Sequence, residues 1–308
     1  MSAPLAYLDE AAVRSVLRWD ELIAAMEDAL AAFSTGRVMQ PVRSVLTIEE
    51  NARFFAVMPA VTDDAMGLKC VTFYPRNEGT ALPTHMAIVL LFSPQTGEPL
   101  ALMDGRLITE MRTAAVSAAV TKRLAAPESR ILAILGSGVQ AKAHLEALSG
   151  LYDFSEVRVW SRTPDHAKRF AGAHGATAME AEAAVRDADI VVVATSAQAP
   201  VLAGRWLKRG AHVNAVGAAR PTWRELDDDA MRNIIVVDSR EAAVKESGDV
   251  VQTKPTIYAE AGELFAGLAA APVAETTIFK SLGLAVEDVA SAKLIYQRIQ
   301  ARKEMTVP

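Results

Sequence analysis

The chain has 308 residues, of which 51% are hydrophobic and 22% charged, a balance that excludes disorder as the main state and allows about two domains. The formal net charge of −5 provides no positive field for nucleic acid. The apolar runs are shorter than the roughly 20 residues of a membrane-spanning helix, and the single cysteine, Cys70, excludes an internal disulfide. Residues 1–10 do not resemble a secretion signal, so we expect a cytoplasmic protein.

The first third of the chain predicts helix followed by antiparallel strands. Asp9 and Asp20 stand where helix N-caps are expected, and an apolar stripe that ends at Gly36 predicts a two-part amphipathic helix. Four β-rich runs separated by turn residues follow, at residues 42–48, 53–58, 67–74 and 86–92. These elements favour an α+β domain.

A helix at residues 106–125 is expected to join this domain to a second one. Beyond it, apolar strands alternate with helical segments, which is typical of a Rossmann-type parallel sheet and an α/β fold class; the strands are expected at 131–135, 157–160, 190–194, 212–216 and 234–237. A last helix, about 284–302, should bury its apolar stripe against the first domain. We therefore expect a domain of residues 1–122, joined by the C-terminal segment 284–308, and a dinucleotide-binding domain of residues 123–283.

The strongest motif lies directly after the strand at 131–135. Gly136, Gly138 and Ala141 form a G-x-G-x-x-A turn, followed by a helix from about residue 139. The first glycine permits the tight turn, the second allows backbone N–H groups to approach a pyrophosphate, and the alanine lets the helix pack closely on the strand. This context predicts a nicotinamide dinucleotide site.

The end of the next strand indicates which dinucleotide is preferred. Ser161, Arg162 and Thr163 stand where an NAD site carries an acid for the ribose 2′-hydroxyl. Because an arginine can pair with a 2′-phosphate, NADPH is favoured, although NADH is possible. The third and fourth strands end at residues 194–196 and 216–218, where a parallel sheet lines its cofactor crevice.

Three cations of the first domain lie in apolar surroundings. Arg43 and Lys69 fall within expected strands, and Arg112 lies on the apolar side of its helix with no acid at helical spacing on that face. A buried cation needs an anion, which is either an internal acid or a carboxylate-bearing ligand.

The chain resembles the ornithine cyclodeaminase and mu-crystallin family over nearly its whole length, and the mu-crystallin branch most closely. The resemblance lies in the segments 40–43, 69–74, 111–115, 135–141, 214–221, 223–228, 245–250 and 279–283. It implies a substrate-binding and dimerisation domain followed by a Rossmann domain, in a homodimer that binds amino acids or their imines.

The resemblance also implies roles for individual residues. Arg43 and Arg112 would hold a substrate carboxylate, with Lys69 beside the reacting carbon as substrate-binding and catalytic residue. Thr84, Thr113 and the loop Ser281, Leu282 and Gly283 would lie near the cofactor. With the motif residues, the expected cofactor-binding set is Thr84, Thr113, Gly136, Ser137, Gly138, Val139, Gln140, Ser161, Arg162, Thr163, Ala194, Thr195, Ser196, Val216, Gly217, Ala218, Ser281, Leu282 and Gly283.

Two departures from the family pattern favour a reductase. Cyclodeaminases carry acids at the positions of Ala56 and Ala219, and ring-closing deamination needs a carboxylate that exchanges protons. We therefore expect NADPH-dependent reduction of a cyclic ketimine carboxylate, such as Δ1-piperideine-2-carboxylate or Δ1-pyrroline-2-carboxylate, to pipecolate or proline.

Other functions stay open at this point. They are reductive amination of a 2-oxo acid in the manner of alanine dehydrogenase, ornithine cyclodeaminase-type deamination, and binding of an aromatic acid by a cofactor-loaded protein with a pocket walled by Phe54, Phe73, Tyr74 and Trp223. Asp227 and Asp228 are interpreted as a helix cap and a surface acid, and Glu225 is ambiguous. The histidines have no spacing suited to metal binding, so no metal site is expected.

Overall fold

The computed structural model describes residues 5–50 and 52–306. The chain forms two compact units, one of Met1–Arg112 with Leu284–Pro308 and one of Thr113–Gly283. The division falls within helix α3 (Gly105–Leu124), the helix in which the sequence placed the boundary at 122/123. The predicted α/β fold class is confirmed, with one parallel and one mixed sheet. Among the described residues, no helix is long and apolar enough to cross a membrane.

The first unit combines a six-stranded sheet with helices from both ends of the chain. The strand order is β1-β6-β5-β4-β3-β2, and all neighbours are antiparallel except β1 and β6. Its elements are β1 (Ala6–Leu8), α1 (Glu10–Val16), α2 (Trp19–Ser34), β2 (Ser44–Glu49), β3 (Arg53–Val61), β4 (Met66–Phe73), the 3-10 turn η1 (Pro75–Asn77), β5 (His85–Phe92), β6 (Pro99–Asp104) and α10 (Ala285–Thr306).

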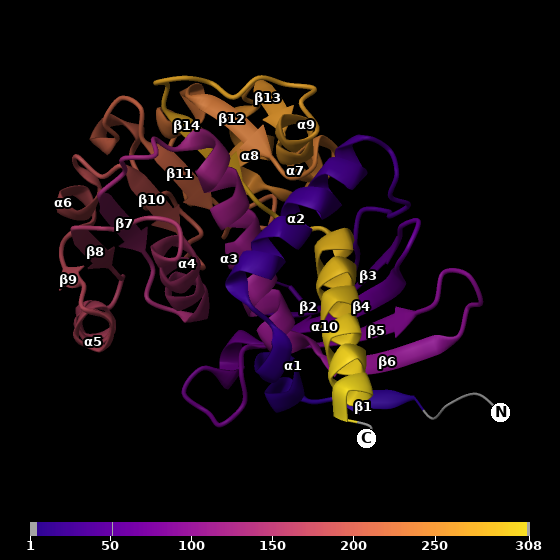
Figure 1. Ribbon diagram of the computed structural model, residues 1–308. Helices are drawn as coiled ribbons and strands as arrows, with labels where there is room; N and C mark the ends of the chain where they lie inside the picture. Colours follow the sequence, from indigo (N-terminus) through magenta and orange to yellow (C-terminus); the bar gives the residue numbers. More distant parts are fainter. Residues whose placement is uncertain (1–4, 51, 307–308) are drawn as a thin grey trace. The chain divides into compact units, whose positions relative to one another are not determined.

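One face of this sheet is buried under helices. Strand β3 alternates buried and half-buried residues along its length, as expected for a strand with one face in a core. The C-terminal helix α10 lies beside α2 and along β3, β4 and β5 (Figure 1). It packs closely, since a Cβ added to Gly67 on β4 would lie 3.3 Å from Val289 Cγ2. The last helix thus belongs to the same compact unit as the first sheet.

The second unit is built on an eight-stranded parallel sheet in the order β13-β12-β14-β11-β10-β7-β8-β9. Its central strands are buried on both faces, as is typical of a sheet covered by helices on two sides. Its elements are β7 (Ile131–Leu135), α4 (Val139–Ser149), β8 (Glu156–Trp160), α5 (Pro164–His174), β9 (Thr177–Ala178), α6 (Ala181–Val185), β10 (Ile190–Val193), η2 (Gly204–Trp206), β11 (His212–Ala215), η3 (Ala230–Arg232), β12 (Ile234–Val237), α7 (Arg240–Glu246), α8 (Gly248–Thr253), β13 (Ile257–Glu260), α9 (Ala261–Phe265) and β14 (Thr277–Lys280).

Several local predictions need correction. Asp9 caps α1 by accepting from Ala12 N at 2.8 Å, but Asp20 lies inside α2, whose N-cap is Arg18. Strand β2 begins at Ser44, so Arg43 directly precedes the strand. Five strands were not predicted from the sequence; they are β1, β6, β9, β13 and β14.

Two buried histidines of the second unit predict acid sensitivity. Burial lowers the pKa of His144 and of His212 to about 4, whereas the unfolded chain titrates near 6.5. Below pH 6.5 the unfolded state binds protons that the folded state does not, so each histidine removes roughly 2–3 kcal/mol of stability between pH 6.5 and 4.5. We expect His144→Gln to show a smaller drop in thermal midpoint from pH 7 to pH 4.5 than the unmodified protein. His166→Gln, at an exposed histidine, should show an unchanged drop; equal drops in all three would contradict the assignment.

Candidate functional site

The predicted cofactor loops follow adjacent strands of the parallel sheet. Across the sheet, β8, β7, β10, β11 and β14 are consecutive neighbours, and each ends in one of these loops. Backbone hydrogen bonds join the loop starts, from Gly136 N to Trp160 O at 2.8 Å and from Ala194 N to Leu135 O at 2.8 Å. The sheet therefore aligns residues 161–163, 136–138, 194–196, 216–218 and 281–283 along its carboxyl edge, where open α/β sheets bind their ligands.

The glycine turn after β7 has the geometry that a pyrophosphate requires. Gly136 has a φ of +120° and a Cβ there would lie 2.3 Å from Ala194 O, so a side chain cannot be accommodated. A Cβ on Gly138 would meet nothing within 4 Å, which leaves open space above the N-terminus of α4, where no side chain caps the helix. Backbone N–H groups at such a helix start suit an anion. The residues present fit a dinucleotide.

The loops beside this turn are held by side chains. Ser137 Oγ donates to Ser161 Oγ at 3.0 Å, which joins the ends of β7 and β8. The buried Asp238 accepts from Gly283 N at 2.7 Å and from Ser281 Oγ at 3.3 Å, which fixes the loop after β14. Ala218 has a φ of +50°, an uncommon backbone conformation for a non-glycine residue.

The first unit brings together the three cations singled out in the sequence. Lys69 on β4 and Arg112 on α3 are 1% and 5% exposed. The charges of Arg112 and Arg43 both lower the pKa of Lys69, so the three cations act on one another electrostatically. The cluster lies on the side of the sheet that α10 covers, because Asp288 on that helix contacts Lys69.

The anions facing these cations include two internal acids that the sequence analysis did not find. Asp288 Oδ2 lies 2.6 Å from Lys69 Nζ, and Asp288 Oδ1 accepts from Arg112 Nε at 3.1 Å. Glu287 Oε2 accepts from Arg112 Nη1 at 2.7 Å. Both acids lie in the first turn of α10. Arg112 therefore pairs with acids from another helix, although its own helix carries no acid on that face.

The charges of this cluster act on the pKa of its members. Lys69 and Arg112 face two carboxylates, with Lys69 against Asp288 and Arg112 against both Asp288 and Glu287. Burial lowers the pKa of Lys69 to about 8, although the charge of Asp288 acts in the opposite direction. For Arg112 burial opposes ionisation, but the two acids outweigh it and raise the pKa of the guanidinium. Lys69 is thus the member that can exchange a proton near neutral pH.

Several other residues named from the sequence make ordinary structural contacts. Thr84 O accepts from Tyr74 N at 2.7 Å, and Thr113 begins the part of α3 that belongs to the second unit. Phe54 and Phe73 stack with ring centroids 6.1 Å apart, as core aromatics do. Asp227 Oδ1 accepts from Ala230 N and Gly204 N.

Sequence reasoning missed several buried polar residues. They are Glu287 and Asp288 of the first unit, and Asp238, Asp249 and Lys280 of the second. The sequence contains a signal for Glu287 and Asp288, because these two adjacent acids lie among apolar residues. The structure buries those apolar residues, Val286, Val289 and Ala292, completely. Charged residues within such a stretch indicate a buried ion pair.

Comparison with known proteins gives matches over most of the chain. The sequence profile of the ornithine cyclodeaminase/mu-crystallin family matches residues 6–303. The ketimine reductase mu-crystallin of Mus musculus is 49% identical over 94% of this chain and 96% of its own. The Δ1-pyrroline-2-carboxylate reductase of Thermococcus litoralis, solved with NADH and L-proline, is 35% identical with a TM-score of 0.92, covering 97% of this chain and 98% of that one. An archaeal alanine dehydrogenase dimer with bound NAD is 34% identical with a TM-score of 0.90, covering 97% of both chains.

Proposed function

The chain belongs to the ornithine cyclodeaminase/mu-crystallin family, and we propose that it is an NADPH-dependent reductase of cyclic ketimine carboxylates. It is an oxidoreductase that uses a nicotinamide cofactor and acts on C=N bonds. The proposed substrates are Δ1-piperideine-2-carboxylate and Δ1-pyrroline-2-carboxylate, with pipecolate and proline as products. The observation that carries this proposal is the buried pair of Lys69 and Arg112, held by Asp288 and Glu287, in a chain that is 49% identical to a ketimine reductase mu-crystallin.

In this proposal the cluster binds and protonates the substrate. Arg43 and Arg112 hold the carboxylate, since guanidinium groups bind carboxylates in a fixed two-point geometry. Glu287 and Asp288 orient Arg112 through its Nη1 and Nε atoms. Lys69 gives a proton to the ring nitrogen, which a pKa of about 8 permits at neutral pH. When bound, the reduced nicotinamide supplies the hydride that the imine carbon accepts.

The side chains at two positions argue against ring-closing deamination. Ala56 is buried on β3 and Ala219 follows the loop at 216–218. A methyl group can neither accept nor return the protons that amine addition and ammonia release require. Ketimine reduction needs neither step, because the C=N bond is already present in the substrate.

A substrate panel tests the proposed function. Purified protein is mixed with NADPH or NADH and with each cyclic ketimine, with pyruvate and ammonium, and with ornithine, while the absorbance of the reduced nicotinamide is followed. We expect cofactor oxidation with the cyclic ketimines. Ammonium-dependent oxidation with pyruvate would support the alanine-dehydrogenase alternative, and ammonia release from ornithine without net cofactor change would support the cyclodeaminase alternative. Turnover with none of them would favour the binding-protein alternative.

The preference for NADPH is proposed to depend on Arg162. This residue is exposed and lies between β8 and α5, next to Ser161, which contacts the glycine turn. A charge-assisted bond to a 2′-phosphate supports about a tenfold or larger difference in affinity. We expect Arg162→Ala to raise KM for NADPH by about tenfold and to leave KM for NADH nearly unchanged. Arg169→Ala, at an exposed arginine of the same helix α5, is the control. Equal changes for both cofactors would refute the assignment.

A homodimer is proposed to form through the sheet face opposite α10. Leu46, Met86 and Ile88 are 60%, 36% and 43% exposed, and the strand register puts all three on one face. An apolar patch of this kind favours association. We expect a dimer by light scattering and a monomer for Ile88→Lys. Val244→Lys, at an exposed apolar residue of α7, should remain dimeric. A monomeric unmodified protein would overturn this proposal.

A further inference from the structure

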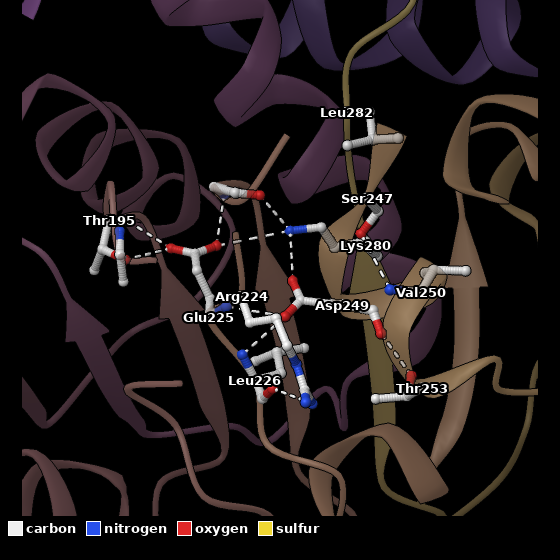
Figure 2. A network of polar contacts seen from close by, with 12 residues as sticks. Thr195, Arg224, Glu225, Leu226, Ser247, Asp249, Val250, Thr253, Lys280 and Leu282 are labelled. Carbon is white, nitrogen blue, oxygen red and sulfur yellow. Dashed lines mark hydrogen bonds and ion pairs between the residues drawn. The ribbon is translucent and has the colours of Figure 1, made fainter. Parts of the chain in front are cut away.

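The second unit contains a buried charged network that the predicted cofactor set does not include. Glu225, Asp249 and Lys280 are all fully buried. Lys280 Nζ lies 3.1 Å from Asp249 Oδ2 and 3.7 Å from Glu225 Oε2, and it donates to Gly217 O. Figure 2 shows Glu225 between Thr195 and Lys280. Removing three ionised side chains from water costs a large desolvation free energy. A contribution to folding stability is therefore a weak explanation for the presence of this network.

Glu225 joins the ends of two neighbouring strands. Its Oε1 accepts from Thr195 N at 2.8 Å and from Thr195 Oγ1 at 2.6 Å, and its Oε2 accepts from Gly217 N at 2.7 Å. Thr195 follows β10 and Gly217 follows β11, where the backbone has left the hydrogen-bonded ladder. A Cβ on Gly217 would lie 2.2 Å from Thr195 O and 2.4 Å from Glu225 Oε1. The carboxylate therefore sets the spacing of the two loops.

Asp249 and Lys280 hold Glu225 in place. Asp249, in the first turn of α8, accepts through Oδ1 from Glu225 N at 2.9 Å and from Leu226 N at 3.0 Å. Lys280 is the last residue of β14 and directly precedes the loop of residues 281–283. The network thus connects the ends of β10, β11 and β14. The turn after β7 and the loop after β8 have their own contacts, Gly136 N to Trp160 O and Ser137 Oγ to Ser161 Oγ.

We propose that Glu225, held by Asp249 and Lys280, is a positioning residue that shapes the nicotinamide half of the cofactor site by fixing the loops after β10 and β11. The inference rests on the proposed function, in which the second unit binds NADPH. The adenosine half is assigned to the loops after β7 and β8, which Glu225 does not contact. Disturbing Glu225 should therefore weaken binding of the whole dinucleotide and spare binding of a fragment that lacks the nicotinamide.

The experiment measures the Kd of NADPH and of 2′,5′-ADP, which lacks the nicotinamide, its ribose and one phosphate, by calorimetry for the unmodified protein and Glu225→Gln. The donors of Thr195 and Gly217 use both carboxylate oxygens of Glu225, whereas a glutamine offers one oxygen only. The amide NH₂ group of the glutamine must therefore face the backbone N–H of Thr195 or of Gly217. We expect the Kd of NADPH to rise about tenfold or more and that of the fragment to stay unchanged. Glu182→Gln, at an exposed acid of the same unit that pairs with Arg186, is the matched control and should change neither value.

A second variant covers the case in which Glu225→Gln does not fold. Asp249→Asn keeps one oxygen for the N–H groups of Glu225 and Leu226 and weakens the hold on Lys280, so we expect the same selective loss at smaller size. An equal loss for NADPH and the fragment, or no loss for either, would overturn the inference. If the unmodified protein binds neither NADPH nor NADH, the proposed function itself fails and the inference fails with it.

Discussion

Replacing Lys69 with methionine is expected to lower kcat for ketimine reduction by about 10²- to 10⁴-fold, the usual contribution of a positioned proton donor. Methionine preserves the length of the side chain and removes the proton. Lys69 is buried, lies 2.6 Å from Asp288 and has a pKa lowered by burial to about 8. It is therefore largely protonated at neutral pH and still able to release the proton to a substrate.

The matched control for this change is Lys69→Arg, which keeps the positive charge but cannot donate at neutral pH because the guanidinium stays protonated. Steady-state kinetics should show low kcat in both variants, with KM raised more in Lys69→Met, where the charge is lost. If Lys69→Met retains kcat and changes only KM, Lys69 is an anchor and the proton comes from water.

The titration of Lys69 adds a pH test of the same role. The protonated form is the donor, so kcat/KM of the unmodified protein should fall as the pH rises above about 8. This alkaline limb should be missing from the residual activity of Lys69→Met. An identical limb in both proteins would assign the titration to another group.

Replacing Asp288 with asparagine is expected to reduce the free energy of unfolding by about 3–5 kcal/mol, the typical cost of removing one partner from a buried ion pair. Asp288 contacts both Lys69 and Arg112 and is fully buried. Without this charge, Lys69 loses the carboxylate that contacts it, whereas Arg112 keeps its contact with Glu287. Arg112 cannot release its proton, so Lys69 is the group that relieves the excess charge.

The loss in Asp288→Asn should depend on pH in a defined direction. The charge of Asp288 raises the pKa of Lys69, so in the variant this pKa falls below 8, whereas in the unfolded chain it stays near 10.4. Between these two values the unfolded state binds more protons than the folded state, so stability rises with pH. The rise should begin at lower pH in the variant than in the unmodified protein, where it begins near pH 8.

Urea unfolding at several pH values measures this effect. The control is Asp64→Asn. Asp64 is an exposed acid that pairs with Lys293, and Lys293 lies on α10, the helix that also carries Asp288. An exposed pair contributes at most about 1 kcal/mol, so the control should lose little stability. Similar losses in the two variants would contradict the assigned importance of the buried cluster.

Much of the cofactor site could be predicted from the sequence. The turn at Gly136 and Gly138 was recognisable because a tight strand-to-helix turn restricts which residues can occupy it, and that restriction is local. The family resemblance, confirmed by the profile match over residues 6–303, added the loop at 281–283. The first boundary and the functional labels of the two domains stay predictions, as do the roles of the site residues.

Contacts between distant segments could not be predicted in the same way. Arg112 and Asp288 are 176 positions apart in the chain, and they meet because α10 packs against the first sheet. Likewise β14 lies between β11 and β12, which brings Lys280 to Glu225 and Asp249. No local pattern in the sequence records which strands become neighbours.

Local patterns in the sequence are sufficient to predict the glycine turn, the strand and helix periods and the three cations in apolar segments. These features are local because backbone sterics and residue polarity act within a few positions of the chain. Packing between distant segments brings Glu287 and Asp288 to Arg112 and Lys69, and it brings Glu225 to the ends of β10 and β11. A buried charge needs a counter-charge nearby, and the packing of the whole chain determines which side chain lies there.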